Sequence, residues 1–163
     1  MKDMLTTVEG CLLKTIVCGN LTAVQLDGGW LYRMAGPVLQ FERTNQDETM
    51  TFWKLDSQET EEGDDILQLT ATADIEEVPY LEWSSDFNSL PVTGSSIQPD
   101  QADSETVTGY GFHHQGDGCL TAVGLKVSGG VIVMKAEAGG LVTVLFTDEI
   151  PDDLGSELEI KHA

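Results

Sequence analysis

The residues best suited to metal or catalytic chemistry gather in one stretch, His113-His114-Gln115-Gly116-Asp117-Gly118-Cys119. Histidine, cysteine and aspartate are the usual zinc ligands, and a structural site needs four of them in a tetrahedron. Adjacent histidines in an extended strand point to opposite faces, so His113 and His114 are poorly placed to bind one ion. No second cluster completes the set, because His162 is the only other histidine. We therefore expect no metal site and interpret the stretch as a solvent-facing turn.

Catalytic and cofactor motifs are equally sparse. The chain has no GxSxG nucleophile motif, and no glycine-rich loop is followed by the lysine of a phosphate-binding loop. The acidic segment 56–65 lacks the order of aspartates that a calcium hand requires. We therefore expect a binding protein rather than an enzyme, with no cofactor.

Charge is the most unusual property of the chain. Twenty-eight Asp and Glu against eight Lys and Arg give the 163 residues a net charge of −20 at pH 7. This balance argues against direct binding to nucleic acid or to an anionic membrane surface, because both need basic residues. No run approaches the ~18 apolar residues of a membrane span. The N-terminus carries acids where a secretory signal has its apolar segment, so we expect a cytoplasmic protein.

The acidic residues are concentrated in one part of the sequence. No Lys or Arg lies between Lys54 and Lys126, an interval that holds fifteen Asp and Glu. Such a field raises association rates with a basic partner by roughly 10- to 10³-fold. Two rings among the acids are expected to act as interface anchors. The predicted partner-binding residues are Glu59, Glu61, Glu62, Asp64, Asp65, Glu76, Glu77, Tyr80, Glu82 and Trp83. The competing interpretation is that the acids only maintain solubility and the rings pack in the core.

An internal repeat predicts the elements that position these residues. GNLTAVQL at 19–26 matches GCLTAVGL at 118–125, and a glycine pair follows each copy, Gly28-Gly29 or Gly129-Gly130. Apolar runs at 30–34 and 131–134, second turns at 35–37 and 138–140, and third runs at 38–41 and 141–146 complete the match. Short runs of Val, Leu and Thr between glycine pairs predict strands joined by tight turns. Each copy therefore predicts a three-stranded meander, and two meanders facing each other would bury a shared apolar layer.

Further strands are predicted at 49–55, 66–72 and 107–112, with a short charged edge strand near the C-terminus. Helix is limited to one or two turns near 74–80 or 148–154, and Trp30 and Trp53 are expected in the core. The predicted fold class is mainly β: an antiparallel sandwich or strongly curved sheet built from two related three-stranded meanders, with little helix. We expect a single domain, 1–163, with repeat copies at about 11–55 and 107–147, joined through an acidic middle segment and a loop at 84–105.

Three cysteines, Cys11, Cys18 and Cys119, are an odd number without CxxC spacing. They predict reduced, mostly buried thiols, as in a cytosolic protein. A disulfide between Cys11 and Cys18 is the alternative.

The acidic surplus favours a small binding protein that neutralises a basic protein by covering its positive surface. An immunity protein that inhibits a nuclease-type toxin has this profile, an analogy that rests on size and charge alone. Two other hypotheses stay open. One is a nucleic-acid mimic that antagonises a DNA-binding enzyme, with carboxylates at phosphate positions. The other is an enzyme or ligand-binding β protein with a carboxylate-lined pocket between the repeats.

Overall fold

The computed structural model describes residues 2–19, 21–27, 29–43, 49–74, 77, 81–83, 89–91, 95–97, 104–113, 119–154 and 156–157. Within them the chain forms one helix and fourteen strands. They are α1 (Lys2–Thr6), β1 (Cys11–Cys18), β2 (Leu21–Leu26), β3 (Gly29–Ala35), β4 (Val38–Arg43), β5 (Met50–Glu59), β6 (Asp65–Thr72), β7 (Leu81–Trp83), β8 (Ser89–Pro91), β9 (Ser95–Ile97), β10 (Ser104–His113), β11 (Leu120–Val127), β12 (Gly130–Glu137), β13 (Leu141–Thr147) and β14 (Ser156–Glu157).

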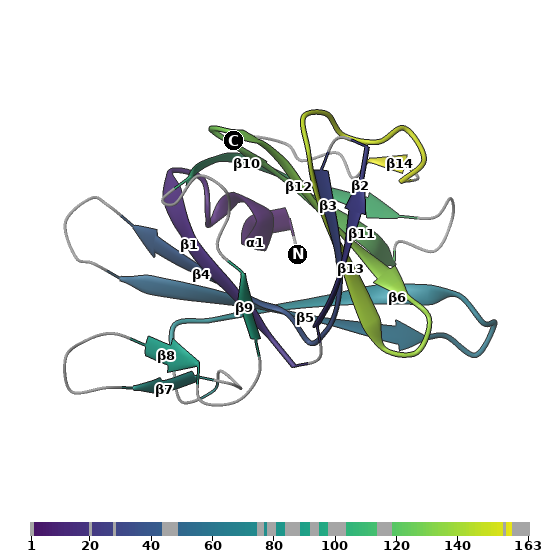
Figure 1. The fold of residues 1–163 in the computed structure, drawn as a ribbon, viewed down its shortest axis with the longest axis horizontal. Helices are drawn as coiled ribbons and strands as arrows, with labels where there is room; N and C mark the ends of the chain where they lie inside the picture. The colour runs from purple at the N-terminus through teal and green to yellow at the C-terminus, as the bar shows by residue number, and fades with distance from the viewer. Residues whose placement is uncertain are drawn as a thin grey trace.

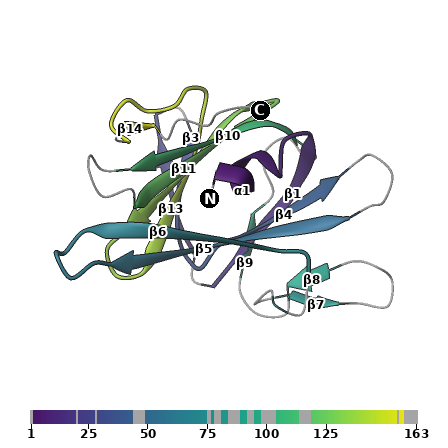
Figure 2. The ribbon, with the colours of Figure 1, turned by 180° about the vertical axis from the view of Figure 1, so that it is seen from behind.

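Nearly all the strands belong to one antiparallel sheet, in the order β2-β3-β13-β12-β11-β10-β1-β4-β5-β6. β14 pairs with β10 and β9 with β1, while β7 and β8 pair only with each other. A short pairing, Leu12 with Glu105 and Leu13 with Ser104, joins β1 to β10. The sheet curves so strongly that β5 and β6 pack against β11, β12 and β13 (Figure 1, and from behind in Figure 2). The predicted mainly β class, a curved antiparallel sheet with little helix, is confirmed.

The main core lies between the two halves of this curved sheet. Trp53 on β5 is fully buried and meets Phe41 on β4 edge to face, with ring centroids 5.1 Å apart. The core is extended by α1, a helix that the sequence patterns did not predict. Leu5 and, just after the helix, Val8 are fully buried, which places α1 inside the curve of the sheet (Figure 1).

The first copy of the repeat is divided between the two halves of the sheet: β2 and β3 lie beside the second copy, whereas β5 packs against β12 and β13 from the other half. β11, β12 and β13 form the predicted meander, but β3 pairs with β2 and β13, whereas β4 pairs with β1 and β5. The first copy therefore departs from the predicted meander. At the second turn Gly36 has φ +51°, and the carbonyl of the following Pro37 accepts from the Leu55 N–H at 2.9 Å, so the chain enters β4 beside β5 rather than beside β3. In the second copy Gly139 and Gly140 at φ +80° and +75° close an ordinary hairpin.

The outer face of β10–β13 carries a second apolar cluster. Phe112, Val131 and Val133 are buried there, and Leu154 and Ile150 from the segment after β13 pack against them. Residues 148–154 form turns and bends rather than the helical turn expected as one possibility. The other possible helical turn, 74–80, falls mostly outside the described residues.

The cysteine geometry excludes the Cys11–Cys18 disulfide. These residues are the first and last of the eight-residue strand β1, so their Cα atoms lie roughly 23 Å apart at about 3.3 Å per residue. A disulfide needs Cα atoms within about 7 Å. None of the three described cysteines forms a disulfide; Cys11 and Cys18 are buried and Cys119 is half-buried.

Candidate functional site: an exposed edge strand and two acidic segments

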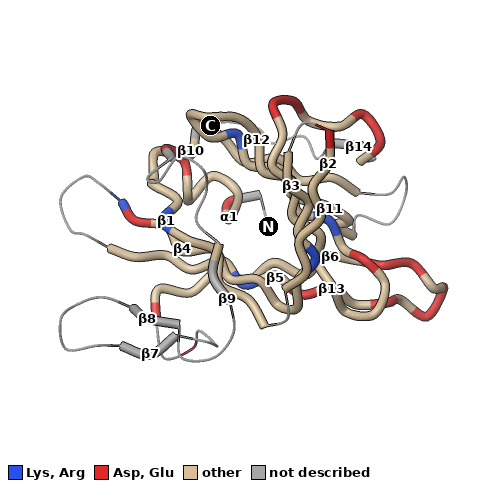
Figure 3. Tube along the Cα trace, in the orientation of Figure 1, with Lys and Arg blue, Asp and Glu red and all other residues tan. Residues whose placement is uncertain are grey.

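Five of the predicted partner-binding acids lie together at the β5–β6 turn. We call Glu59, Glu61, Glu62, Asp64 and Asp65 the turn acids. Glu59 pairs with Asp65 in the ladder, and Glu61, Glu62 and Asp64 are exposed. Within the described part of the chain, none of the five forms an ion pair with Lys or Arg. Figure 3 shows them projecting from one end of the long axis of the molecule.

Hydrogen bonds hold the backbone of the β5–β6 turn in a fixed conformation. The Thr60 N–H donates to the Asp64 carbonyl at 2.8 Å, and the Gly63 N–H donates to the Thr60 carbonyl at 3.0 Å. The Thr60 hydroxyl accepts from the Asp64 N–H at 3.1 Å, and Gly63 takes φ +89°. The β5–β6 hairpin is linked to β12 by Ser57, whose hydroxyl donates to the Glu137 carbonyl at 2.9 Å. The carboxylates therefore extend from a turn whose backbone is held by hydrogen bonds, rather than from a loose loop.

Among the remaining predicted residues, Glu77 is not brought to this turn. The Glu77 carboxylate accepts from the Thr72 hydroxyl at 2.7 Å, at the far end of β6 from Asp65. The eight residues of β6 separate Thr72 from the turn acids by roughly 23 Å. Glu82 and Trp83 lie in β7, of which only the backbone is described. Glu76 and Tyr80 lie outside the described residues.

The exposed aromatic and aliphatic side chains lie elsewhere, on the β2–β3 hairpin. Trp30 is 40% exposed, Leu26 45% and Val24 38%. Trp30 stacks on Tyr32 with ring centroids 6.3 Å apart, and Tyr32 meets Phe146 edge to face at 5.8 Å. The expectation of Trp53 in the core is confirmed, but that of Trp30 is wrong, because β3 is one strand from the end of the sheet and its neighbour β2 covers little of the ring.

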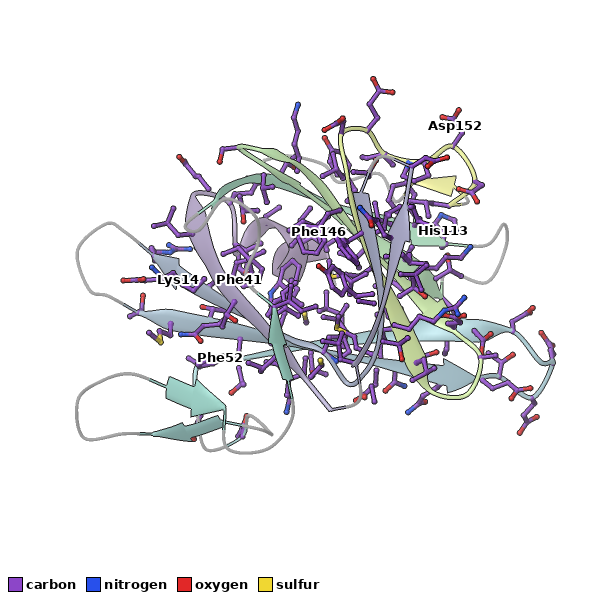
Figure 4. The ribbon with its side chains drawn as sticks, in the orientation of Figure 1. Lys14, Phe41, Phe52, His113, Phe146 and Asp152 are labelled. Atoms are coloured by element: carbon purple, nitrogen blue, oxygen red, sulfur yellow. The ribbon has the colours of Figure 1, made fainter. Side chains whose placement is uncertain are left out.

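A second acidic segment lies beside this hairpin. Asp148, Glu149, Asp152 and Asp153, which we call the C-terminal acids, are all exposed and follow directly after β13. Asp27, also exposed, lies at the β2–β3 turn beside them, since Gly29 approaches the Phe146 carbonyl. Figure 4 shows Phe146 directed into the molecule and Asp152 directed away from it. The described residues include no ion pair to any of these acids.

The two acidic segments lie near opposite ends of β13. The C-terminal acids follow its last residue, whereas Ser57, which leads to the turn acids, lies against Glu137 and Gly140 just before its first. The seven residues of β13 set a span of roughly 20 Å between the two ends. Arg33 on the intervening β3 is already paired, its Nε 3.1 Å from Glu137 Oε1. The β2–β3 hairpin lies along β13, and its exposed apolar side chains are near the end that precedes the C-terminal acids.

This arrangement is suited to binding a cationic protein surface. Exposed carboxylates flank apolar side chains that are partly desolvated already, the usual composition of an interface with a charged rim.

Three further observations concern metal binding, the histidines and membrane-spanning helices. No group of three metal-ligating side chains occurs in the described part of the chain. His113 lies at the end of β10, and His114 is outside the described residues. The described residues include no helix long and apolar enough to cross a membrane.

The sequence predicted the β2–β3 hairpin but not its exposed apolar surface, and the C-terminal acids were not among the predicted binding residues. A signal for the acids was present, because Asp148-Glu149 and Asp152-Asp153 lie in a run without Lys or Arg between Lys135 and Lys161. The exposure of the hairpin left no such signal, since it follows from the place of β2 at the end of the sheet.

No protein-family model matches the chain, and comparisons with curated proteins and with solved structures find no match.

Proposed function

We propose that this chain binds a positively charged protein and covers its basic surface. In its specific form, the partner is a nuclease-type toxin and the chain is the immunity protein that inhibits it. Inhibition is steric and electrostatic: the chain covers the basic surface of the partner, and its carboxylates attract and pair with Lys and Arg there. The observation that carries the proposal is the set of turn acids, which lie on a turn with a hydrogen-bonded backbone and have no cationic partner in the described chain.

Two physical effects support this function. A net charge of −20 attracts a cationic partner over long range and raises the rate of productive encounter. A turn whose backbone is already held by hydrogen bonds loses less conformational entropy on binding than a loose loop does. Each long charged side chain that must be ordered on binding costs about 0.5–1.5 kcal/mol.

A second candidate is a mimic of nucleic acid that antagonises a DNA-binding enzyme. It is favoured by the separation of the two acidic segments along β13, because a mimic needs charges spaced over a length of surface rather than one compact patch. The two candidates differ in one measurable way. A mimic competes with DNA for its target at every salt concentration, whereas an inhibitor bound beside the nucleic-acid site leaves DNA binding intact.

The experiment uses the full chain as bait in a lysate of its native host, followed by association kinetics with the captured partner. The test variant is Glu61→Lys/Glu62→Lys. The matched control is Asp3→Lys/Glu105→Lys, which changes net charge equally at two other exposed acids, on α1 and at the start of β10. The test variant should lower the association rate several-fold more than the control. For the toxin form, the partner is a nuclease and loses activity when one equivalent of the chain is added.

The dependence of the association rate on ionic strength distinguishes long-range electrostatic attraction from short-range contact. Raising ionic strength from about 0.05 to 0.5 M shortens the Debye length to a few ångströms, so the association rate of the wild-type chain should fall at least tenfold. A rate that is unchanged by salt, or that falls equally in the test and control variants, contradicts the role of the turn acids.

A further inference from the structure

β2 is an edge strand without the usual protection against pairing. It ends the strand order and is paired only with β3 in the described part of the chain. Natural edge strands discourage further pairing by charged residues, proline or a bulge. The sequence of β2, LTAVQL, has no charge and no proline, and its register with β3 is regular. Alternate residues of β2 therefore direct their N–H and C=O groups away from β3, toward solvent.

Both faces of this edge are open to a side chain from an added strand. Every residue of β2 after Leu21 is exposed. Val24 and Leu26 lie on one face beside Leu31, and Trp30 lies opposite Gln25 on the other. An added strand would bury apolar surface on both faces, as well as complete the backbone hydrogen bonds.

The charges around the edge favour one kind of occupant. Asp27 follows β2 directly and the C-terminal acids lie beside it, so an added strand would end among exposed carboxylates. A second copy of this chain would bring another −20 of charge to the contact. An extended segment with alternating apolar residues can pair with the β2 edge, and Lys or Arg beside those residues can pair with Asp27 and the C-terminal acids.

We propose that the β2 edge accepts an extended basic segment of the partner as an additional strand. The inference rests on the proposed function, since it specifies how the same basic partner is bound. The turn acids then act on the rate of encounter, and the β2 edge holds the complex after encounter.

The test uses two synthetic peptides titrated into the full chain. One alternates valine and threonine over six residues, with two lysines at each end. The other has the same sequence, with every second backbone amide N-methylated, so that charge is kept and strand pairing is blocked. The first peptide should bind at least tenfold more tightly, with amide chemical-shift changes concentrated in Leu21–Leu26. Equal affinities would show that only charge attracts the peptide and would overturn strand addition, while leaving the proposed function standing.

Two proline variants provide a second measurement. Ala23→Pro and Val24→Pro fall on neighbouring residues, so one of them removes an N–H that faces solvent and the other an N–H bonded to β3. The former should keep its melting temperature, because edge strands tolerate proline there, and should lose peptide affinity at least tenfold. Unchanged affinity in that folded variant overturns the inference. A wild-type dimer in sedimentation equilibrium that this variant abolishes also overturns it, in favour of pairing between two copies.

Discussion

The substitution Gly29→Ala tests whether the β2–β3 hairpin is held in place by close backbone packing against β13. A Cβ at Gly29 would lie 2.6 Å from the Phe146 carbonyl oxygen, whereas carbon–oxygen contacts between strands are normally about 3.3–3.6 Å. The obstacle is backbone, which cannot rotate away as a side chain does. The hairpin must therefore shift from β13 by several tenths of an ångström or more.

Gly124→Ala is the matched control. Gly124 is buried in the central strand β11, and a Cβ there would meet the Phe112 ring at 3.5 Å and Tyr110 side-chain atoms at 3.8 and 3.9 Å, which are ordinary contacts. Both substitutions gain the same backbone term, about 0.5–1 kcal/mol, from replacing a strand glycine. The difference between the two variants therefore isolates the steric cost, which for forced overpacking is typically about 1–3 kcal/mol.

The free energies of unfolding are measured by urea denaturation and the melting temperatures by calorimetry. Gly29→Ala should be less stable than Gly124→Ala by about 1–3 kcal/mol, which corresponds to roughly 2–12 °C for a chain of this size. Hydrogen exchange should be faster at β2 and β3 in Gly29→Ala than in the wild type. If the two variants are equally stable and exchange at β2 is unchanged, the hairpin is not held by this contact.

The other predictions concern burial and charge. Trp53→Ala should lower the free energy of unfolding by about 3–5 kcal/mol, because the ring is fully buried. Trp30→Ala, at a ring that is 40% exposed, should lower it by less than about 1.5 kcal/mol; similar losses in urea denaturation would contradict the assigned burial. A thiol reagent should modify native Cys119 before Cys11 and Cys18, which are 2% and 0% exposed, and equal rates without denaturant would be inconsistent with the fold. Raising NaCl from about 0.05 to 0.5 M should raise the melting temperature, since screening weakens the self-repulsion of the −20 charge; a decrease would mean that attractive pairs outweigh repulsion.

The local parts of the fold could be predicted from the sequence, because alternation and glycine turns act over a few residues. The hairpins β2–β3, β11–β12 and β12–β13 follow from these signals. α1 could not be predicted, since five residues are too short for helical periodicity and the buried Leu5 and Val8 hold it in place. β1 was not predicted, for another reason: its register with β4 shifts between Leu13 and Thr15, and this irregularity breaks the alternation of apolar and polar residues along the strand. The turn acids are a run in the sequence, so their common location was predictable.

The repeat shows most clearly what tertiary structure decides. The tetrapeptide LTAV occurs in both copies, at 21–24 in β2 and at 120–123 in β11. In β11 all four residues are buried, because this strand is central and β6 packs against it from the other half of the sheet. In β2 the last three are exposed, because the strand ends the sheet and, among the described residues, pairs only with β3. The amino-acid sequence determined that both segments are strands. Only long-range pairing, which no local pattern encodes, made one of them core and the other an open edge.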